Sequence, residues 1–461
     1  MAKQTITEAR DFPAIEELLQ EDLLAGVIGS IPRPLASDLI KETVAALKLK
    51  LKETGKPISL SKLHDAIRDR IDGYRLQGIT RVINATGILV HTNLGRAPIP
   101  ENIVKTITAA ITGYSNVEFD LAAGRRGQRG MLCESYLARL AEAEQGTVVN
   151  NCAAALFIII NTFANRKKVI ISRGELVQIG GGFRIPDVLR RAGARLSEIG
   201  TTNITRIDDY EQAVDANTAM ILKVHQSNFV QTGFTEAVEL RDLVLLGKKH
   251  NIPVVNDLGS GVFVETREIF GYSEPTVQQS VRAGADLTCF SGDKMLGGMQ
   301  AGLIVGRSEL VQKIKENPLF RTVRVDKVLF ALLEQLLAIY LDRTHVEEIP
   351  VWNMLSVPAS ELYKAGKQIL KEIGSPSGVS VEATKAFVGG GAVPESDIPS
   401  VALIFSPEFG ATRLLTGFRQ HNPPIIGRIE NERFLLDLKA VAPGDYPHLI
   451  RAIKQFIPAT K

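Results

Sequence analysis

The chain has 461 residues, of which 45% are hydrophobic and 23% are charged, and its formal net charge is +3. This balance is typical of a globular protein and excludes a chain that is disordered throughout. Because the length exceeds the size at which one core usually stops growing, we expect a main domain with smaller domains attached. The net charge is too small to indicate a nucleic-acid partner by itself.

The cysteines and the apolar segments exclude further classes. Cys133, Cys152 and Cys289 are far apart and show no paired metal-ligand spacing, so we expect a reducing cytoplasm and no metal site. The most apolar stretches, residues 153–160 and 328–341, are too short or are interrupted by polar residues, and we expect no membrane span. The N-terminus lacks the basic start and apolar core of a secretory signal.

The first part of the chain predicts a small helical domain over residues 1–75. Apolar residues recur at helical spacing through residues 14–74, and Ser59 and Ser61 are candidate helix caps. The basic residues in its later part most simply indicate a solvated helix surface, and the alternative is a face that binds nucleic acid. The basic residues concerned are Lys41, Lys48, Lys50, Lys52, Lys56, Lys62, Arg68, Arg70, Arg75 and Arg81.

After residue 147 the pattern changes to short β-branched runs separated by helical stretches. This alternation predicts an α/β domain with a mostly parallel sheet, over residues 76–330. A long apolar helix pattern and later strand-like runs then predict an α+β domain over residues 331–461. The runs of the central sheet are residues 169–172, 219–224, 253–256, 287–290 and 303–305.

Lys294 is the strongest chemical signal. It ends the sequence Ser291-Gly292-Asp293-Lys294, directly after a strand-like run, where parallel sheets bind ligands. A partly desolvated pocket lowers the pKa of a lysine, and the neutral amine can form an imine with a carbonyl. Taken alone, a lysine in a surface loop is the better interpretation.

Asp257 favours a chemical role for Lys294 over a surface-loop lysine, because the aspartate also ends a strand-like run. Its carboxylate would keep the pyridine nitrogen of pyridoxal phosphate protonated, although a helix cap is the simpler role for the aspartate alone. Asn151, Cys152 and Ala153 open a predicted helix, where backbone N–H groups can bind a phosphate. In chain order, phosphate turn, aspartate and lysine match the parts of aminotransferase-like pyridoxal enzymes.

Two further sets of residues are candidates for the same site. His225 and Asn228 follow another predicted strand and could stack on the cofactor ring or bind it, with a structural histidine nearly as good an interpretation. Arg96, Arg321 and Arg324 lie in loop or glycine-containing segments. An arginine fork suits a phosphate or carboxylate, and surface ion pairs are the alternative.

Nearly the whole chain resembles the bacterial selenocysteine synthase family, the L-seryl-tRNA(Sec) selenium transferases. The resemblance rests on residues 82–96, 172–186, 290–302 and 424–429 taken together. It implies a fold-type I pyridoxal-phosphate transferase with Lys294 as the Schiff-base lysine. It also implies that Asp257 lies near the pyridine nitrogen and Ser291 near the cofactor phosphate.

The resemblance further implies partners and a reaction. Asp293 matches an active-site position, and the three arginines match the family's anion-binding arginines. The first domain would bind tRNA, and the subunits would form a homo-oligomer of dimers, such as a decameric ring. Seryl-tRNA(Sec) would become selenocysteinyl-tRNA(Sec) by β-elimination through an aminoacrylyl-tRNA intermediate, followed by addition of selenium from selenophosphate.

Three departures from the family pattern concern details of phosphate binding and loop shape. Cys152 stands where asparagine is common, Gln178 where glutamate is common, and Met299 where proline is common. None removes a proposed catalytic group. Two rival functions remain: a related pyridoxal lyase acting on a small phosphorylated or free amino-acid-type substrate, and an RNA-binding scaffold without catalysis.

Overall fold

The computed structural model describes residues 5–179, 182–271, 273–391 and 397–457. Its internal contacts divide the chain into two units, Met1–Val82 and Ile83–Lys461. Helix α4 (Leu60–Arg75) ends where we expected the first domain to end, and the unit continues through a loop to Val82. The expected boundary at residue 330 falls inside α14 (Lys327–Asp342), which lies wholly in the second unit.

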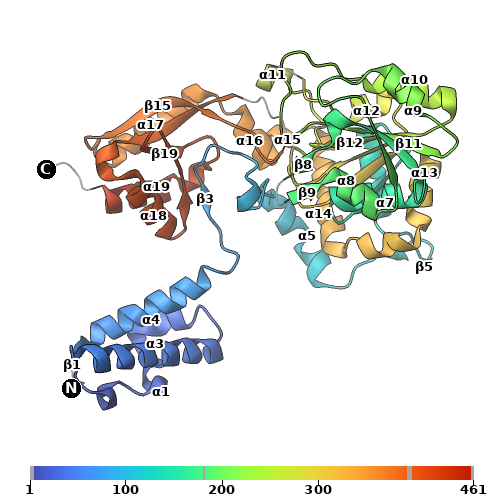
Figure 1. The fold of residues 1–461 in the computed structure, drawn as a ribbon. Helices are drawn as coiled ribbons and strands as arrows, with labels where there is room; N and C mark the ends of the chain where they lie inside the picture. Colours follow the sequence, from blue (N-terminus) through green and yellow to red (C-terminus); the bar gives the residue numbers. More distant parts are fainter. Residues whose placement is uncertain (1–4, 180–181, 272, 392–396, 458–461) are drawn as a thin grey trace. The chain divides into compact units, whose positions relative to one another are not determined.

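The first unit is a hairpin of two helices with short elements packed beside it (Figure 1). Helix α3 (Arg33–Thr54) ends at Gly55, whose φ of 63° is the left-handed conformation that glycine adopts without strain. The side chain of Ser59 accepts a hydrogen bond from the backbone N–H of Lys62 and so caps α4. The short elements are β1 Thr5–Ile6, α1 Ile15–Leu18, α2 Asp22–Ile28 and β2 Ile58–Ser59.

No single helix within the described ranges is long and apolar enough to cross a membrane. Helices α2 and α3 meet the criteria of length and composition only as a bent pair. Their apolar residues, among them Leu24 and Ile40, lie in the core of the first unit together with Leu63 and Ile67 of α4.

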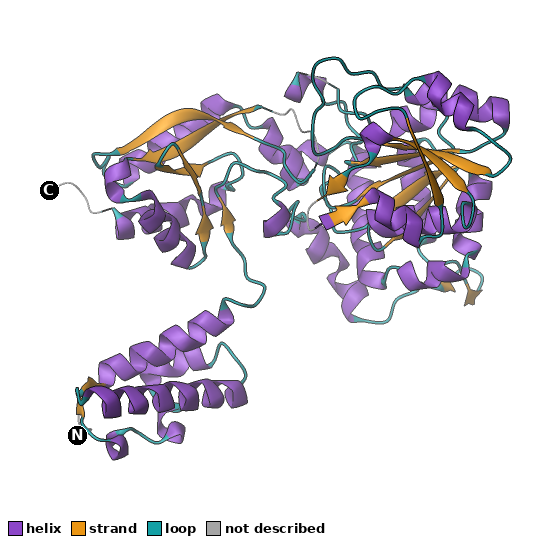
Figure 2. Ribbon diagram, viewed as in Figure 1, coloured by secondary structure: helices purple, strands orange, loops and turns teal. Residues whose placement is uncertain are grey.

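The second unit is built on a seven-stranded sheet with helices on both faces (Figure 2). The strand order is β10-β7-β11-β12-β13-β14-β6, and only β14 runs antiparallel to its neighbours. The mostly parallel sheet was therefore predicted correctly. The strands are β6 Gln145–Val149, β7 Lys168–Ser172, β10 Arg195–Ile199, β11 Thr218–Val224, β12 Val254–Gly259, β13 Leu287–Ser291 and β14 Gly302–Gly306.

The central strands are apolar on both faces because helices cover both. In β7, Val169 and Ile171 pack into one core and Ile170 packs into another. Our prediction missed β10, since this edge strand alternates with polar residues and is only partly buried. The helices against the sheet are α7 Cys152–Phe163, α8 Ile185–Arg191 and α13 Ser308–Glu316 on one face, and α6 Met131–Ala141, α10 Leu240–His250 and α12 Val277–Ala283 on the other.

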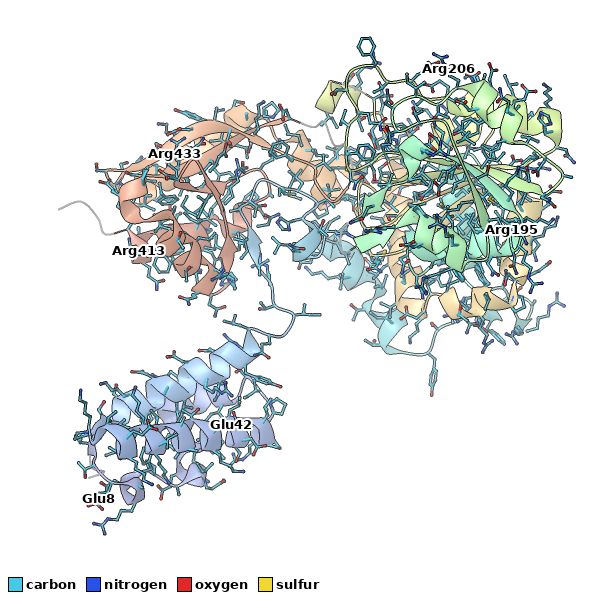
Figure 3. All side chains as sticks on the ribbon, in the orientation of Figure 1. Glu8, Glu42, Arg195, Arg206, Arg413 and Arg433 are labelled. Carbon is cyan, nitrogen blue, oxygen red and sulfur yellow. The ribbon has the colours of Figure 1, made fainter. Side chains whose placement is uncertain are left out.

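The C-terminal part of this unit is a four-stranded antiparallel sheet with helices packed on it. The predicted strands near residues 402 and 433 are present, and β15 is an additional strand whose alternating burial left no apolar run to detect. Arg433 and Arg413, labelled in Figure 3, lie in this part. Its elements are β15 Val379–Ala386, β16 Ile398–Phe405, β18 Arg428–Glu430, β19 Arg433–Asp437, α17 Ala359–Glu372, α18 Ala411–Gln420 and α19 Tyr446–Phe456.

The first strand of the second unit, β3 (Ile83–Asn84), belongs with this C-terminal part. It pairs in parallel with β17 (Ile425–Ile426), and Arg428 donates hydrogen bonds to the Thr86 carbonyl and the buried Asp437 carboxylate. The remaining elements are α5 Glu101–Thr112, β4 Phe119–Asp120, β5 Arg125–Arg126, β8 Gln178–Ile179, β9 Phe183–Arg184, α9 Ile207–Ala213, α11 Arg267–Phe270, α15 His345–Glu348 and α16 Pro350–Ser356.

Candidate active site

A cavity of about 290 Å³ opens where the parallel strands of the central sheet end. This position is typical of ligand sites in open α/β sheets, and the volume lies just below the usual range of small-molecule sites, about 300 to 1,000 Å³. Most of the residues that we predicted from sequence line it: Arg96, Asn151, Cys152, Ala153, His225, Asp257, Ser291, Asp293 and Lys294.

Lys294 follows β13 in the turn toward β14 and is 5% exposed. Its amine donates a hydrogen bond to the carbonyl of Gly391 at 3.1 Å. Burial lowers the pKa of Lys294, and the neighbouring Arg96 lowers it further, whereas the acidic groups and Cys152 oppose that shift. The neutral amine is the form that attacks carbonyls and accepts protons, so the pocket favours both reactions.

Asp257 is a buried carboxylate on β12, and two cysteines surround it. The thiol of Cys152 lies 3.6 Å from Oδ1 of Asp257, and Cys289 stands opposite Asp257 in the pairing of β12 with β13. Burial raises the pKa of Asp257, while the charge of Lys294 and the two thiols oppose the rise. The register then shifts by one residue before Gly259, so a bulge lies directly beside the aspartate.

The turn between β6 and α7 presents backbone donors to the same cavity. Asn151 caps α7 by accepting a hydrogen bond from the N–H of Ala154 at 2.8 Å. Cys152 and Ala153 are the first helical residues, whose N–H groups have no partner within an α-helix. Together with the helix dipole, they suit an anion such as a phosphate.

His225 is held by a buried acid that sequence reasoning did not identify. Its Nε2 lies 2.9 Å from a carboxylate oxygen of Glu274, and its backbone N–H donates to the Asp257 carbonyl. A second buried acid, Glu175, accepts a hydrogen bond from the N–H of Val224 at 2.9 Å, directly before His225. Burial raises the pKa of Glu175. Glu175 lies in the family-like segment 172–186, but neither acid was predicted to act at the site, because the partners of both are about fifty positions away in sequence.

Arg96 and Asp293 form the polar wall of the cavity beside Lys294. The guanidinium of Arg96 donates to the Asp293 carboxylate, and Arg96 has a φ of 64° after a left-handed Gly95. This tight turn directs the arginine toward the site. A side-chain carboxylate on one edge of the guanidinium leaves its other N–H groups available for an anion.

Three predicted residues do not line this cavity within one chain. Asn228 is exposed, and its amide donates to the Gln178 carbonyl. Arg324 lines a separate cavity and lies 3.4 Å from a Glu118 oxygen. Arg321 is exposed in a 3₁₀ segment.

Gly302, at the start of β14, packs against the turn that presents the α7 donors to the cavity. A Cβ at this position would lie 2.1 Å from the Asn151 carbonyl oxygen, so β14 approaches the turn at α7 more closely than any other residue would allow. Gln300 and Ser227 line the cavity as well as the predicted residues, whereas Gly302 lies behind its wall and is not among the lining residues.

The comparisons with known proteins agree with this geometry. The family model "SelA: L-seryl-tRNA selenium transferase" matches residues 82–442. An L-seryl-tRNA(Sec) selenium transferase of Carboxydothermus hydrogenoformans is 38% identical over 454 residues, covering 97% of each chain. The enzyme of the same name from Aquifex aeolicus is 42% identical over 408 residues, covering 87% of this chain and 90% of that one.

A solved structure of D-glucosaminate-6-phosphate ammonia-lyase shares the fold, with a TM-score of 0.60 and 19% identity, over 83% of this chain and 97% of that one. The predicted fold-type I, aminotransferase-like architecture is thus confirmed. With a family model covering most of its length and relatives similar from end to end, the chain belongs to the L-seryl-tRNA selenium transferase family.

Proposed function

We propose that this chain converts L-seryl-tRNA(Sec) to L-selenocysteinyl-tRNA(Sec), with pyridoxal phosphate bound at Lys294 and selenophosphate as the selenium donor. The observation that carries the proposal is the meeting of Lys294, Asp257 and the start of α7 at one cavity, in a chain of this family. An amine, a buried carboxylate and free backbone donors are what the aldehyde, the pyridine nitrogen and the phosphate of this cofactor require.

When bound, pyridoxal phosphate supplies an electron sink that stabilises the carbanion left by removal of an α-proton. Residues of the chain bind the cofactor and move the proton. Asp257 holds a proton at the pyridine nitrogen, and Ser291 with the N–H groups of Cys152 and Ala153 holds the phosphate. The amine of Lys294 takes the α-proton of the seryl group, because burial keeps it neutral more often than a surface lysine.

Arg96 is the proposed binding group for the selenium donor, oriented by Asp293. Selenophosphate is an anion, and the guanidinium fork matches its oxygens. His225, fixed by Glu274, lies beside Asp257 where it can contact the cofactor ring. The β-hydroxyl of serine would leave as water, selenium from selenophosphate would add in its place, and hydrolysis of the selenium–phosphorus bond would release inorganic phosphate, while the ester link to tRNA is retained.

The first unit is the proposed tRNA-binding part. Its basic residues are not all neutralised: Lys41, Arg68, Arg70 and Arg75 pair with acids, but within the described part of the chain Lys50, Lys52, Lys56 and Lys62 form no ion pair. These four lysines gather at the turn between α3 and α4. Figure 3 labels Glu42, the partner of Arg70, on the same unit.

We also propose that a second copy completes the site, in a homo-oligomer built from dimers. Arg321 and Arg324 do not line the Lys294 cavity within one chain, so they would reach the cavity of a partner. Large apolar side chains around α5 and α6 are exposed, and three of them, Phe119, Met131 and Leu132, line a hollow of about 880 Å³ that a second copy would cover. The exposed residues are Tyr114, Phe119, Leu121, Met131 and Leu132.

Conversion of seryl-tRNA(Sec) by the purified chain with selenophosphate tests the main proposal, with ordinary seryl-tRNA and free serine as competing substrates. We expect selenocysteinyl-tRNA only from tRNA(Sec), and borohydride should fix the cofactor at Lys294. Turnover of free serine without seryl-tRNA binding would instead support a small-substrate lyase. A chain without cofactor absorbance or a borohydride adduct would be the RNA-binding scaffold.

Subunit mixing tests the shared site. Lys294→Met and Arg324→Ala are each expected to be inactive, and their mixture should recover activity, because a mixed dimer contains one intact site. The oligomer mass is measured alongside by light scattering. If the mixture stays inactive although subunits exchange, Arg324 does not act across the interface.

A further inference from the structure

Two cysteines and an aspartate that are far apart in sequence meet at the cofactor cavity. Cys152 is the first residue of α7, Asp257 lies on β12 and Cys289 on β13. Their ligand atoms all lie within 4.8 Å of one another. Spacing along the chain gave no metal-ligand pattern, but the fold brings these three donors together.

One donor–donor distance in the group equals that of a tetrahedral metal site, and the other donors lie within 4.8 Å. Zinc binds sulfur at about 2.3 Å and a carboxylate oxygen at about 2.0 to 2.2 Å, so tetrahedral angles place those two ligand atoms about 3.6 Å apart. The sulfur of Cys152 lies 3.6 Å from Oδ1 of Asp257 in the structure. Hydrogen bonds of the two thiols with the carboxylate and with each other hold the group together when no ion is bound.

The three donors are held in place by the fold. Cys289 is fully buried and stands opposite Asp257 in the sheet, and the Asn151 cap fixes the start of α7. Little reorganisation would therefore accompany binding of an ion. Cys152 and Asp257 also line the cavity, so a fourth ligand such as water can reach the ion from that side.

We propose that Cys152, Asp257 and Cys289 bind one thiophilic divalent cation, such as Zn²⁺ or Cd²⁺, when the cofactor is absent. The two thiols release their protons to solvent on binding, and no electron transfer is involved. The second half of the inference rests on the proposed function: Asp257 cannot bind the metal and the pyridine nitrogen together. The cation and pyridoxal phosphate therefore exclude each other.

Titration of the full-length, cofactor-stripped chain with Cd²⁺ tests the site directly. We expect one ion per chain, with the ultraviolet charge-transfer absorbance of a cadmium–thiolate bond. Mutation of a residue that only hydrogen-bonds to a metal ligand typically lowers metal affinity by about 10- to 100-fold. Loss of a ligand itself should therefore lower Cd²⁺ affinity by at least about 100-fold. The variants are Cys152→Ser and Cys289→Ser.

Cys133→Ser is the matched control, because Cys133 is a buried cysteine outside the group. It should bind Cd²⁺ like the unchanged chain. Circular dichroism checks that each variant is folded, and Asp257→Asn tests the third ligand with a side chain of nearly the same shape. Undiminished binding by folded variants, or absence of the charge-transfer absorbance in the unchanged chain, would overturn the metal site.

A competition experiment tests the exclusion. Pyridoxal phosphate is added to the stripped chain with and without saturating Zn²⁺, and the visible absorbance of the lysine-bound cofactor is followed. We expect Zn²⁺ to reduce the apparent cofactor affinity, and prior loading with cofactor to abolish Cd²⁺ binding. Simultaneous binding of both would contradict the exclusion. A chain that binds Cd²⁺ but never pyridoxal phosphate would refute the proposed function and leave the metal site standing.

Discussion

The guanidinium of Arg96 donates a hydrogen bond to the carboxylate of Asp293, which precedes Lys294. The two residues are separated by 197 positions in sequence, so only the fold brings them together. The ion pair connects Arg96, the proposed binding group for selenophosphate, to the turn that carries Lys294. We therefore expect the effects of replacing Arg96 and Asp293 to depend on each other.

Replacement of Arg96 by alanine should reduce kcat/KM for the selenium donor by about 100- to 1,000-fold, because a preorganised charge is removed. Asp293→Asn should have a smaller effect in the same direction. Since the residues touch, the double variant should lose less than the two single losses combined. Arg282→Ala, which removes an exposed pair with Glu142, is the control and should change little. Additive losses would show that the residues act independently.

Lys294→Met should raise the free energy of unfolding of the cofactor-free chain at neutral pH. Burial lowers the pKa of Lys294 below its ordinary value of 10.5, so the unfolded chain binds more protons than the folded chain between the two pKa values. Stability of the unchanged chain therefore rises with pH in that window. The advantage of the variant should shrink through the window and vanish above pH 10.5.

Urea unfolding at a series of pH values measures this difference. Lys364→Met, on the exposed surface of α17, is the matched control and should show no pH-dependent gain. An advantage of Lys294→Met that is independent of pH would contradict the burial argument.

Gly302→Ala should destabilise the second unit by about 1 to 3 kcal/mol, as overpacking usually does. The added Cβ would lie 2.1 Å from the Asn151 carbonyl oxygen, so the start of α7 must move, and cofactor affinity should fall as well. Gly73→Ala is the opposite case, because nothing lies within 4 Å of its Cβ and it sits inside α4. It should stabilise the first unit by about 0.5 to 1 kcal/mol. Unfolding curves of both variants check the two signs.

Arg428→Ala should destabilise the chain by about 3 to 5 kcal/mol, because it leaves a buried carboxylate without its charged partner. Arg428 donates to Asp437 at 2.9 Å, and the Asp437 side chain is fully buried. Replacement of both residues, with Asp437→Asn, should cost less than Arg428→Ala alone. Denaturant midpoints of the single and double variants test this order, with exposed Arg413→Ala as the control.

Neutralising the lysines at the α3–α4 turn should weaken seryl-tRNA binding and flatten its salt dependence. Each RNA phosphate that a lysine no longer neutralises reduces the slope of log affinity against log salt by about 0.7 to 0.9. Lys50→Ala combined with Lys52→Ala is the test, and Lys364→Ala combined with Lys371→Ala on α17 is the control. Binding is measured by filter retention at several salt concentrations. An unchanged slope would place the RNA elsewhere.

Much of the fold followed from local patterns. The central strands were predicted because burial on both faces makes them continuous apolar runs, whereas β10 and β15 escaped because half of their residues are polar or exposed. The catalytic candidates followed from position: Asp257 and Lys294 each stand at the end of a strand, and parallel strands present their ends at one edge.

The sequence by itself determined the class of sheet and, through its resemblance, the family, and it predicted Lys294 and Asp257 as the central site residues. The tertiary structure alone decided which distant residues meet. Glu274 reaches His225, Cys289 reaches Asp257, and β3 joins the C-terminal part rather than the central sheet. Side-chain contacts of this kind depend on strand register and helix packing between segments far apart in sequence, and no local pattern encodes them.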